Sequence, residues 1–430
     1  MRPLQSIYAV VLAGGRGSRL HQLTDWRAKP AMPFAGSLKI IDFALSNCIN
    51  SGIRRIGVLT QYKAQSLIRH ITRHWGFLDA RLGEFIDVVP AQQRMDEHWY
   101  TGTANAVWQN LDMLHEAQPS HVLILAGDHV YKMDYARLVD EHLQSRSAVT
   151  LSCIRVPREQ ASAFGILSVD AGQQVVSFQE KPANAPGLAE SPDHCLASMG
   201  IYLFNTDTLV EELERDARDP LSRHDFGHDV LPRLVKQGRV RAHQFALSAV
   251  PATAQSPYWR DVGTLDSYWE AHMDLIRPLP ELDLYDPTWP IRGSNGSWPP
   301  AKFVADSQGR PGTASDSLIS GGTIVSGATV KRCVLFPHVR VTDGAVVEDS
   351  LLLQGVQLGS GCVVRRAIID KQCILPAGTQ VGVDVMRDRQ RFCVSPAGVT
   401  LVTRSMLPTT EPIVAPDTPT FLDVGHPVAA

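Results

Sequence analysis

Residues 324–340 read IVSGATVKRCVLFPHVR, and the pattern returns in VTDGAVVEDSLLLQGVQ (341–357), LGSGCVVRRAIIDKQCI (358–374) and LPAGTQV (375–381). Aliphatic residues recur here at steps of 17 in three sets. The sets are Leu318, Leu335, Leu352 and Ile369; Ile324, Val341, Leu358 and Leu375; and Val330, Val347, Val364 and Val381. Glycine keeps the same step at Gly327, Gly344, Gly361 and Gly378. A repeat of this regularity indicates stacked copies of one structural unit.

The spacing within each repeat predicts a parallel β-helix of about four coils over residues 317–405. The aliphatic residues are separated by 6, 5 and 6 positions, as expected for three short strands per coil that each turn one side chain inward. A glycine at a fixed place in every coil suits a turn with positive φ, whereas a sandwich of evenly spaced strands has no need of it. The spacing also resembles the hexapeptide repeats of left-handed β-helices, and the predicted handedness comes from that resemblance.

Upstream, residues 1–277 alternate short apolar runs with helix-like segments, which predicts an α/β domain with a Rossmann-like, mostly parallel sheet. The expected strands are Tyr8–Leu12, Arg55–Thr60, Val122–Leu125, Ala148–Arg155 and Met199–Phe204. Ligands of such sheets collect beyond the carboxyl ends of the strands, so functional residues are expected directly after these runs. Seven prolines between Pro278 and Pro311 predict a linker over residues 278–316, and further prolines predict a disordered tail over 406–430.

The composition of the 430 residues excludes several classes of protein. Lys and Arg number 41 against 44 Asp and Glu, so there is no overall basic field for a nucleic-acid partner. The seven cysteines never form a Cys-x-x-Cys pair, which argues against a disulfide framework or a zinc site and predicts a cytoplasmic location. The apolar run 7–13 is too short to span a membrane and leads into glycines without a cleavage signal, so we expect a soluble protein without a membrane partner.

A glycine-rich turn follows the first expected strand, in Gly14-Gly15-Arg16-Gly17-Ser18-Arg19-Leu20. Backbone N–H groups of such a turn are able to approach a phosphate closely. The turn lacks the Gly-Lys-Ser/Thr of a Walker loop and the third glycine of a dinucleotide fingerprint. Two cations that could face a polyphosphate follow, Arg19 and Lys29. Taken alone, a turn of this kind is more often structural.

Further motifs, in order along residues 7–405, resemble those of the sugar-nucleotide pyrophosphorylases, and specifically the bacterial ADP-glucose pyrophosphorylases. The motifs are the glycine turn, Arg27-Ala28-Lys29-Pro30-Ala31, Ile40-Ile41-Asp42-Phe43-Ala44-Leu45-Ser46-Asn47-Cys48, Pro90-Ala91-Gln92-Gln93-Arg94, Leu125-Ala126-Gly127-Asp128-His129-Val130-Tyr131, Glu180-Lys181-Pro182-Ala183-Asn184, Ala197-Ser198-Met199-Gly200-Ile201-Tyr202 and Tyr258-Trp259-Arg260-Asp261-Val262-Gly263-Thr264. The resemblance implies the reaction of ATP with glucose 1-phosphate to ADP-glucose and pyrophosphate, which supplies glycogen synthesis.

The resemblance also implies roles for individual residues. Asp128 follows an expected strand, where an isolated aspartate is more often a helix N-cap, but the family pattern pairs it with Asp261 on one Mg²⁺. Arg19, Lys29 and Asp128 are the implied catalytic residues. The implied ATP-binding residues are Gly14, Gly15, Gly17, Gln61 and Gln92, and the implied sugar-phosphate-binding residues are Tyr100, Gly165, Glu180, Lys181 and Ser198.

The chain departs from the family pattern in two regulatory positions, Trp26 and Thr101, where enteric relatives carry basic residues. The resemblance also implies an allosteric enzyme, whose candidate effector contacts here are Arg27, Lys39 and Arg391. The family further implies a homotetramer. Three alternatives stay open. They are a pyrophosphorylase for another nucleotide or sugar 1-phosphate, a non-catalytic regulatory subunit, and an acyltransferase on the β-helix, where His338 is the only histidine between residues 318 and 381.

Overall fold

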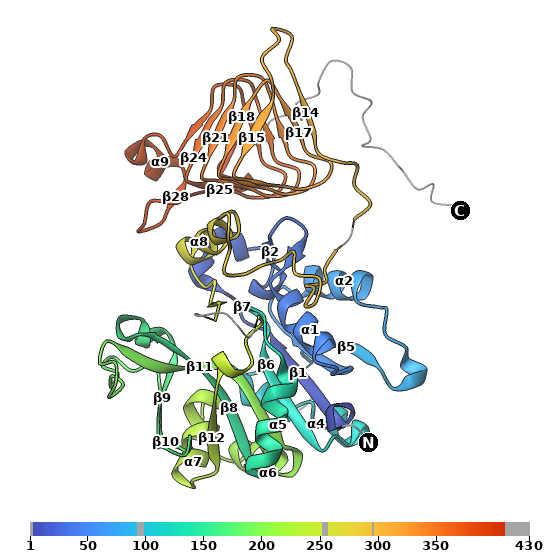
Figure 1. Cartoon of the computed structure of the whole chain (residues 1–430), viewed down its shortest axis with the longest axis vertical. Coiled ribbons are helices and arrows are strands. Elements are labelled where there is room, and N and C mark those ends of the chain that lie inside the picture. Colours follow the sequence, from blue (N-terminus) through green and yellow to red (C-terminus); the bar gives the residue numbers. More distant parts are fainter. Residues whose placement is uncertain (1–2, 93–98, 252–256, 295, 409–430) are drawn as a thin grey trace. The chain divides into compact units, whose positions relative to one another are not determined.

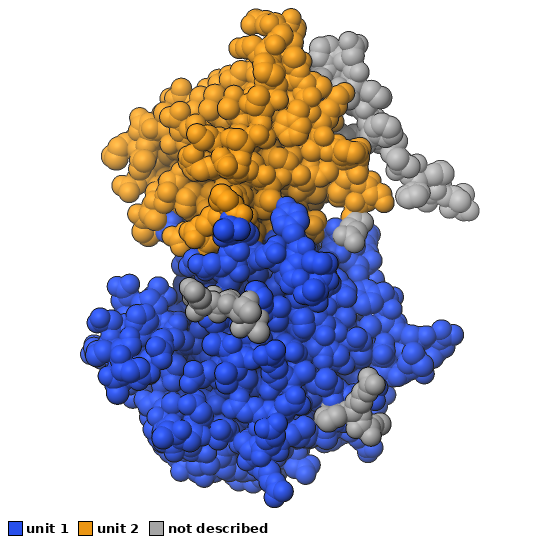
Figure 2. Space-filling model, viewed as in Figure 1, with its two compact units in different colours: residues 1–34, 38–267, 279–295 blue, residues 35–37, 268–278, 296–430 orange. Residues whose placement is uncertain are grey.

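The computed structural model describes residues 3–92, 99–251, 257–294 and 296–408. The chain divides into two compact units, which are described separately (Figure 2). Unit 1 comprises residues 1–34, 38–267 and 279–295, and unit 2 comprises residues 35–37, 268–278 and 296–430. The predicted disordered tail lies almost wholly outside the described residues, which end at residue 408. Among the described residues, no helix has the length and apolar character needed to cross a bilayer.

Unit 1 is built on a nine-stranded sheet whose centre is β1 (Ile7–Ala13) (Figure 1). Strands β6 (His121–Ala126), β1, β4 (Arg55–Thr60) and β5 (Phe85–Pro90) lie side by side and parallel, in that order. Strand β11 (His194–Asn205) runs antiparallel to β6. The remaining strands of the sheet are β8 (Val149–Pro157), β9 (Gly165–Val169), β10 (Val175–Glu180) and β12 (Val240–Gln244). All five predicted strands are present, and the antiparallel course of β11 is the feature that the pattern did not predict.

Helices cover both faces of this sheet, because β1 is apolar on both sides and its side chains alternate between two cores. Ile7, Ala9 and Val11 pack with buried residues of α1, α2 and α5, whereas Tyr8 and Val10 pack with α3, α4, α6 and α7. The helices are α1 (Ile41–Asn50), α2 (Gln65–His74), α3 (Thr103–Trp108), α4 (Leu111–Ala117), α5 (Tyr135–Ser145), α6 (Thr206–Ala217) and α7 (Leu231–Lys236). A ligand therefore reaches this sheet at the carboxyl ends of its strands rather than across its faces.

Short elements complete unit 1, and α8 continues from it into unit 2. They are the strands β2 (Pro33–Phe34), β3 (Leu38–Lys39), β7 (Val130–Tyr131) and β13 (Trp259–Arg260), the π-helix Phe226–Val230 and α8 (Leu265–Leu275). The pair β7 and β13 forms a two-stranded sheet of its own. This small sheet matters for the site, because it joins segments that are far apart in the sequence.

Unit 2 contains three parallel sheets whose strands alternate along the chain, as in a β-helix (Figure 1). The first sheet has β14 (Lys302–Val304), β17 (Ile324–Ser326), β20 (Arg340–Val341), β23 (Gln357–Leu358) and β26 (Ile374–Leu375). The second has β15 (Thr313–Ser315), β18 (Thr329–Lys331), β21 (Val346–Glu348), β24 (Val363–Arg365) and β27 (Gln380–Val381). The third has β16 (Leu318–Ile319), β19 (Val334–Leu335), β22 (Leu351–Leu352), β25 (Ala367–Ile369), β29 (Thr400–Val402) and, antiparallel at its edge, β28 (Cys393–Val394). Helix α9 (Val385–Arg391) lies between β27 and β28 in sequence. The three parallel sheets are consistent with the predicted left-handed β-helix.

The register of the first coil differs from the predicted one by a single residue. Val325, rather than Ile324, pairs with Val341 and is fully buried. Ile319, rather than Leu318, pairs with Leu335. The paired residues 325 and 341 are 16 positions apart, whereas the paired residues 341 and 358 are 17 apart. Because neighbouring strand residues point to opposite faces, one missing residue exchanges the inward and outward side chains of that strand.

The repeated glycines have the predicted conformation, with φ of +52° at Gly327 and +71° at Gly344. Gly361 and Gly378 follow at +69° and +71°. Strands β14 and β15 both lie within residues 278–316, the segment expected to be a linker. The β-helix therefore begins before the aliphatic repeat becomes regular, because these two strands pair with the next coil through their backbones.

Leu352→Ala is expected to lower the free energy of unfolding of unit 2 by about 2–5 kcal/mol, because its fully buried side chain fills the core of the coils. Gln354→Ala, at an exposed position of the same coil, is the matched control and is expected to change it by less than about 0.5 kcal/mol. Denaturant-dependent hydrogen exchange of amides in residues 340–375 measures this unit selectively. Equal losses of protection in the two variants would contradict the predicted packing.

Candidate active site

The loops after β1, β4 and β6 all begin at the carboxyl-end side of the unit 1 sheet, because these three strands are parallel and in register. Leu12 of β1 lies opposite Ala126 of β6, and Ala13 lies opposite Thr60 of β4. The residues that follow these strands, Gly14, Gln61 and Asp128, therefore lie near one another. They line a cavity of about 470 Å³, as the rule for the carboxyl ends of parallel strands predicts.

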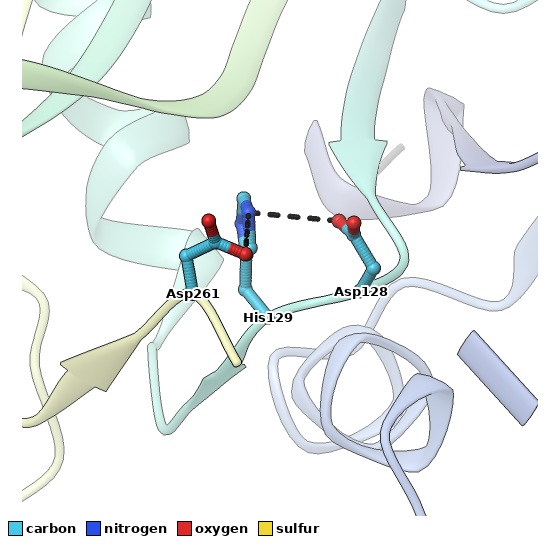
Figure 3. Close-up of side chains that lie close together, drawn as sticks. All are labelled: Asp128, His129 and Asp261. Carbon is cyan, nitrogen blue, oxygen red and sulfur yellow. Dashed lines mark ion pairs between the residues drawn. The ribbon is translucent and has the colours of Figure 1, made fainter. Parts of the chain in front are cut away.

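The small sheet of β7 and β13 brings Asp261 to this side of the unit 1 sheet. Arg260 of β13 pairs with Val130 of β7, which directly follows Asp128 and His129. Figure 3 shows the resulting cluster, in which the His129 ring lies between the two carboxylates. One ligand atom from each of the three residues lies within 4.8 Å of the others. The arrangement brings together the two aspartates that the sequence analysis paired.

Lys29 forms an ion pair with each of the two aspartates. Its Nζ lies 3.0 Å from Asp128 Oδ2 and donates a hydrogen bond to Asp261 Oδ1, and its side chain is only 5% exposed. Arg19 approaches from the solvent side, with Nη2 3.5 Å from Asp261 Oδ2. Gly17 holds the turn against this cluster, since a Cβ at its position would lie 2.9 Å from Lys29 Cβ and its φ is +67°.

Lys29 and Asp128 each stabilise the charged form of the other. Burial disfavours the charged form of Lys29, but the attraction of Asp128 and Asp261 outweighs it and raises the pKa of Lys29. Burial likewise opposes ionisation of Asp128, but the attraction of Lys29 outweighs it and lowers the pKa of that carboxyl below its usual value. Both groups are therefore charged at neutral pH, so Lys29 acts as a fixed cation rather than as a proton donor.

A second cavity of about 350 Å³ adjoins the first and holds the predicted sugar-phosphate residues. Gly165, Glu180, Lys181 and Ser198 line it together with Lys29, Arg19, Asp128 and Asp261. The two cavities share Asp128, Glu180 and Lys181 in their linings. Lys181 Nζ lies 3.0 Å from Glu180 Oε1, and its side chain is 58% exposed. The cleft therefore has two compartments that meet at Asp128.

Comparison with known proteins places this cleft in a known family. Residues 8–277 match the family described as Nucleotidyl transferase, and residues 299–402 match the family described as GlmU-like, C-terminal hexapeptide. A protein of Dechloromonas aromatica named Glucose-1-phosphate adenylyltransferase is 55% identical over 404 residues, which cover 94% of this chain and 92% of that protein. The chain belongs to the glucose-1-phosphate adenylyltransferase family. Relatives of the same name in Nitrosospira multiformis and Paramagnetospirillum magneticum are 55% and 53% identical over 93% and 94% of this chain, and over 94% and 95% of their own lengths.

Membership of the glucose-1-phosphate adenylyltransferase family confirms the resemblance that the sequence motifs carried. The chain is a nucleotidyltransferase, and the family match ends at residue 277, where the first domain was predicted to end. The hexapeptide match begins at residue 299, ahead of β14. The individual site residues are not tested by these matches, so the geometry of the cleft carries their assignment.

Most of the predicted ATP-binding residues line the larger cavity of this family member, but Gln92 does not. Gly14, Gly15 and Gln61 line it, while Gly17 lines the second cavity. Tyr100, predicted for the sugar phosphate, instead lies on the Gln61 side, where its backbone oxygen accepts a hydrogen bond of 3.2 Å from Gln61 Nε2. Gln92 is exposed and lines neither cavity. Gln92 follows β5, but a position just after a strand does not by itself bring a side chain into the cleft.

The three candidate effector residues of this chain lie in different environments. Arg27 is buried at 4% exposure, and Lys39 Nζ donates to the Ser66 backbone oxygen at 3.1 Å. Arg391, at the end of α9, lies in unit 2, with its guanidinium 4.7 Å from the Phe392 ring centroid. No binding function of these three residues follows from their contacts.

The sequence analysis missed several residues of the cleft. Gly200 has φ of +68° and lies where β11 shifts register against β8, so an isolated glycine in an apolar strand was the available signal of a bulge. Asp225 caps the π-helix by accepting from the Gly227 and His228 amides. His129 directly follows Asp128, yet nothing in the sequence showed that its ring turns to the same side as both aspartates.

Proposed function

We propose that the chain transfers the adenylyl group of ATP to glucose 1-phosphate, forming ADP-glucose for glycogen synthesis and releasing pyrophosphate. One observation carries the assignment: two adjoining compartments of one cleft meet at Asp128, beside the buried Lys29 and Asp261. One compartment follows the glycine turn, the other contains Arg19, Gly165 and Ser198, and Lys181 lines both. The curated relatives, at 51–55% identity, bear the name of this activity.

The reaction requires two anions to approach each other. A phosphate oxygen of glucose 1-phosphate forms a bond to the α-phosphorus of ATP, while the bond from that phosphorus to the bridging oxygen breaks and pyrophosphate leaves with the electron pair. Two like unit charges about 4 Å apart repel by about 4 kcal/mol at an effective dielectric of about 20. Positive charge in the second compartment comes from Lys29, Arg19 and Lys181, which all line it. Their role is to offset this repulsion and to orient the reacting groups.

The carboxylates of Asp128 and Asp261 suit a magnesium ion, which prefers one or two carboxylates with phosphate oxygens and water. Ligand atoms from both residues lie within 4.8 Å of each other, so the two carboxylates face one site. When bound, Mg²⁺ would withdraw charge from the phosphate oxygens. Lys29 forms an ion pair with each carboxylate, which holds the two together before substrate arrives.

The glycine turn suits the triphosphate. A Cβ at Gly15 would meet no atom within 4 Å, so the backbone N–H groups there are approachable from the cavity. Gln61, which lines the larger cavity, is the amide proposed to pair with the adenine edge. On the other side, Lys181 is proposed to contact the sugar phosphate as a point charge, and Glu180 to accept hydrogen bonds from sugar hydroxyls.

Lys181→Ala is expected to raise KM for glucose 1-phosphate by about 10-fold to 100-fold and KM for ATP by less than about 3-fold, because one charge-assisted contact is lost on the sugar side only. Steady-state kinetics with each substrate varied in turn measures the two constants. Arg155→Ala, at a half-exposed cation paired with Glu190, serves as the control. Equal changes in both constants would contradict the assignment of Lys181.

The activity itself is tested by pyrophosphate release from the purified chain with glucose 1-phosphate and, in turn, ATP, UTP, GTP and dTTP. Preference for ATP is the expected result. Preference for another nucleotide would favour the alternative pyrophosphorylase, and no turnover would favour a regulatory subunit. The same assay with a panel of glycolytic metabolites tests the proposed allosteric control through Arg27, Lys39 and Arg391, and light scattering tests the proposed homotetramer.

A further inference from the structure

His129 faces the two aspartates at distances longer than those of a good hydrogen bond. Its Nε2 lies 3.5 Å from Asp128 Oδ1 and 4.0 Å from Asp261 Oδ1 (Figure 3). The 4.0 Å separation is too long for a hydrogen bond, and the 3.5 Å one is at the limit. A cation with bonds of about 2.1 Å separates its ligand atoms by about 3.0 Å at a right angle and about 4.2 Å across the ion. The observed distances fall within that interval.

We propose that His129 Nε2 is a third protein ligand of the divalent cation held by Asp128 and Asp261, which widens the site from Mg²⁺ to Mn²⁺ and Co²⁺. This inference rests on the metal site of the proposed function and adds a nitrogen ligand to it. Imidazole nitrogen favours first-row transition metals, whereas carboxylates and water suit Mg²⁺. Mn²⁺ and Co²⁺ bind either kind of ligand, so a mixed site of two oxygens and one nitrogen accepts them more readily than Mg²⁺.

The charge of the cluster explains why a third ligand is needed. Asp128 and Asp261 together carry two negative charges, which Lys29 offsets through its two ion pairs and Arg19 through its ion pair with Asp261. The site that remains attracts a divalent cation less strongly than two free carboxylates would. A neutral imidazole adds a lone pair without adding positive charge, so it offsets the weakening that Lys29 causes.

The imidazole is held in the required direction. Its ring packs edge to face on Trp259, with the ring centroids 5.0 Å apart, and Trp259 packs in the same way on Phe164 at 5.3 Å. The side chain is 14% exposed, and the strand β7 begins at the next residue. Nδ1 is buried and has no hydrogen-bond partner among the described residues. Packing on Trp259 therefore holds Nε2 toward both aspartates.

Electron spin-echo envelope modulation of the full-length wild-type chain with Mn²⁺ alone tests the ligand directly. We expect modulation from one directly bound imidazole nitrogen, and labelling the protein with ¹⁵N-histidine is expected to change its frequencies. This measurement needs no variant and no catalytic turnover. An Mn²⁺ spectrum without nitrogen modulation would overturn the proposal, and His129 would then be only a neighbour of the site.

The variant His129→Gln provides the second test, with metal binding measured by calorimetry. Co²⁺ affinity is expected to fall by about 10-fold to 100-fold and Mg²⁺ affinity by less than about 3-fold, because the lost donor is nitrogen. His115→Gln, on the exposed side of α4, is the matched control for surface binding of Co²⁺. Equal losses for Co²⁺ and Mg²⁺, or no loss, would contradict nitrogen ligation.

Failure of this inference is distinguishable from failure of the proposed metal site. If Asp128→Asn and Asp261→Asn lose Mn²⁺ binding while His129→Gln retains it, the aspartates bind the cation and His129 does not. If all three variants bind Mn²⁺ as the wild type does, the metal site is elsewhere and both proposals fail.

Discussion

Asp128→Asn is expected to lower kcat by about 1,000-fold, which corresponds to about 4 kcal/mol of transition-state stabilisation. The substitution keeps the size of the side chain but removes the carboxylate at the point where the two compartments of the cleft meet. It removes a negative oxygen ligand from the proposed cation site and one of the two counter-charges of Lys29. Binding of each substrate by the remaining cations should change less, so the loss is expected in kcat more than in KM.

Single-turnover measurement of ADP-glucose formation at saturating Mg²⁺ checks this result. Asp140→Asn, at an exposed position of α5 on the same unit, is the matched control and is expected to retain wild-type activity. If the Asp128→Asn variant has a kcat within about threefold of the wild-type value, Asp128 does not act in the reaction. The proposed role of the cleft as the active site would then be wrong.

Lys29→Met is expected to abolish measurable activity and also to destabilise unit 1 by about 3 kcal/mol. Lys29 is the buried cation between Asp128 and Asp261, so its removal leaves two carboxylates close together without a counter-charge. The same change removes the ammonium that is proposed to offset the charge of the phosphates. Methionine keeps much of the length and apolar volume of the side chain, so the effect is attributable to charge rather than to a cavity.

The double variant Lys29→Met/Asp128→Asn separates charge repulsion from general disruption. Once one carboxylate is neutral, the repulsion is relieved, so the double variant is expected to be more stable than the sum of the two single changes by about 1–3 kcal/mol. Chemical denaturation followed by hydrogen exchange in unit 1 measures each value. Lys236→Met, at an exposed position of α7, controls for the loss of a lysine. Strict additivity would show that Lys29 and Asp128 do not interact as the structure describes.

Much of the fold could be predicted from local patterns. A step of 17 residues with glycine at a constant place predicted the coils, and four apolar runs predicted β1, β4, β6 and β8 closely. Periodicity reports which side chains face a core, and that is a local property of the chain. It failed at Ile324, where one coil is a residue shorter, because the register there depends on pairing with the next coil.

The sequence by itself determined that a sheet domain precedes a β-helix, that a glycine turn follows the first strand and that Asp128 lies at a strand end. Only the tertiary structure decided that Asp261 lies beside Asp128, through the pairing of β13 with β7, and that Lys29 is buried between them. It also decided the direction of the His129 ring and that Gln92 lines neither cavity. The physical reason is that strand periodicity depends on neighbouring residues. The ion pairs of Lys29 with Asp128 and Asp261, which lie 99 and 232 positions along the chain, depend instead on how the whole domain packs.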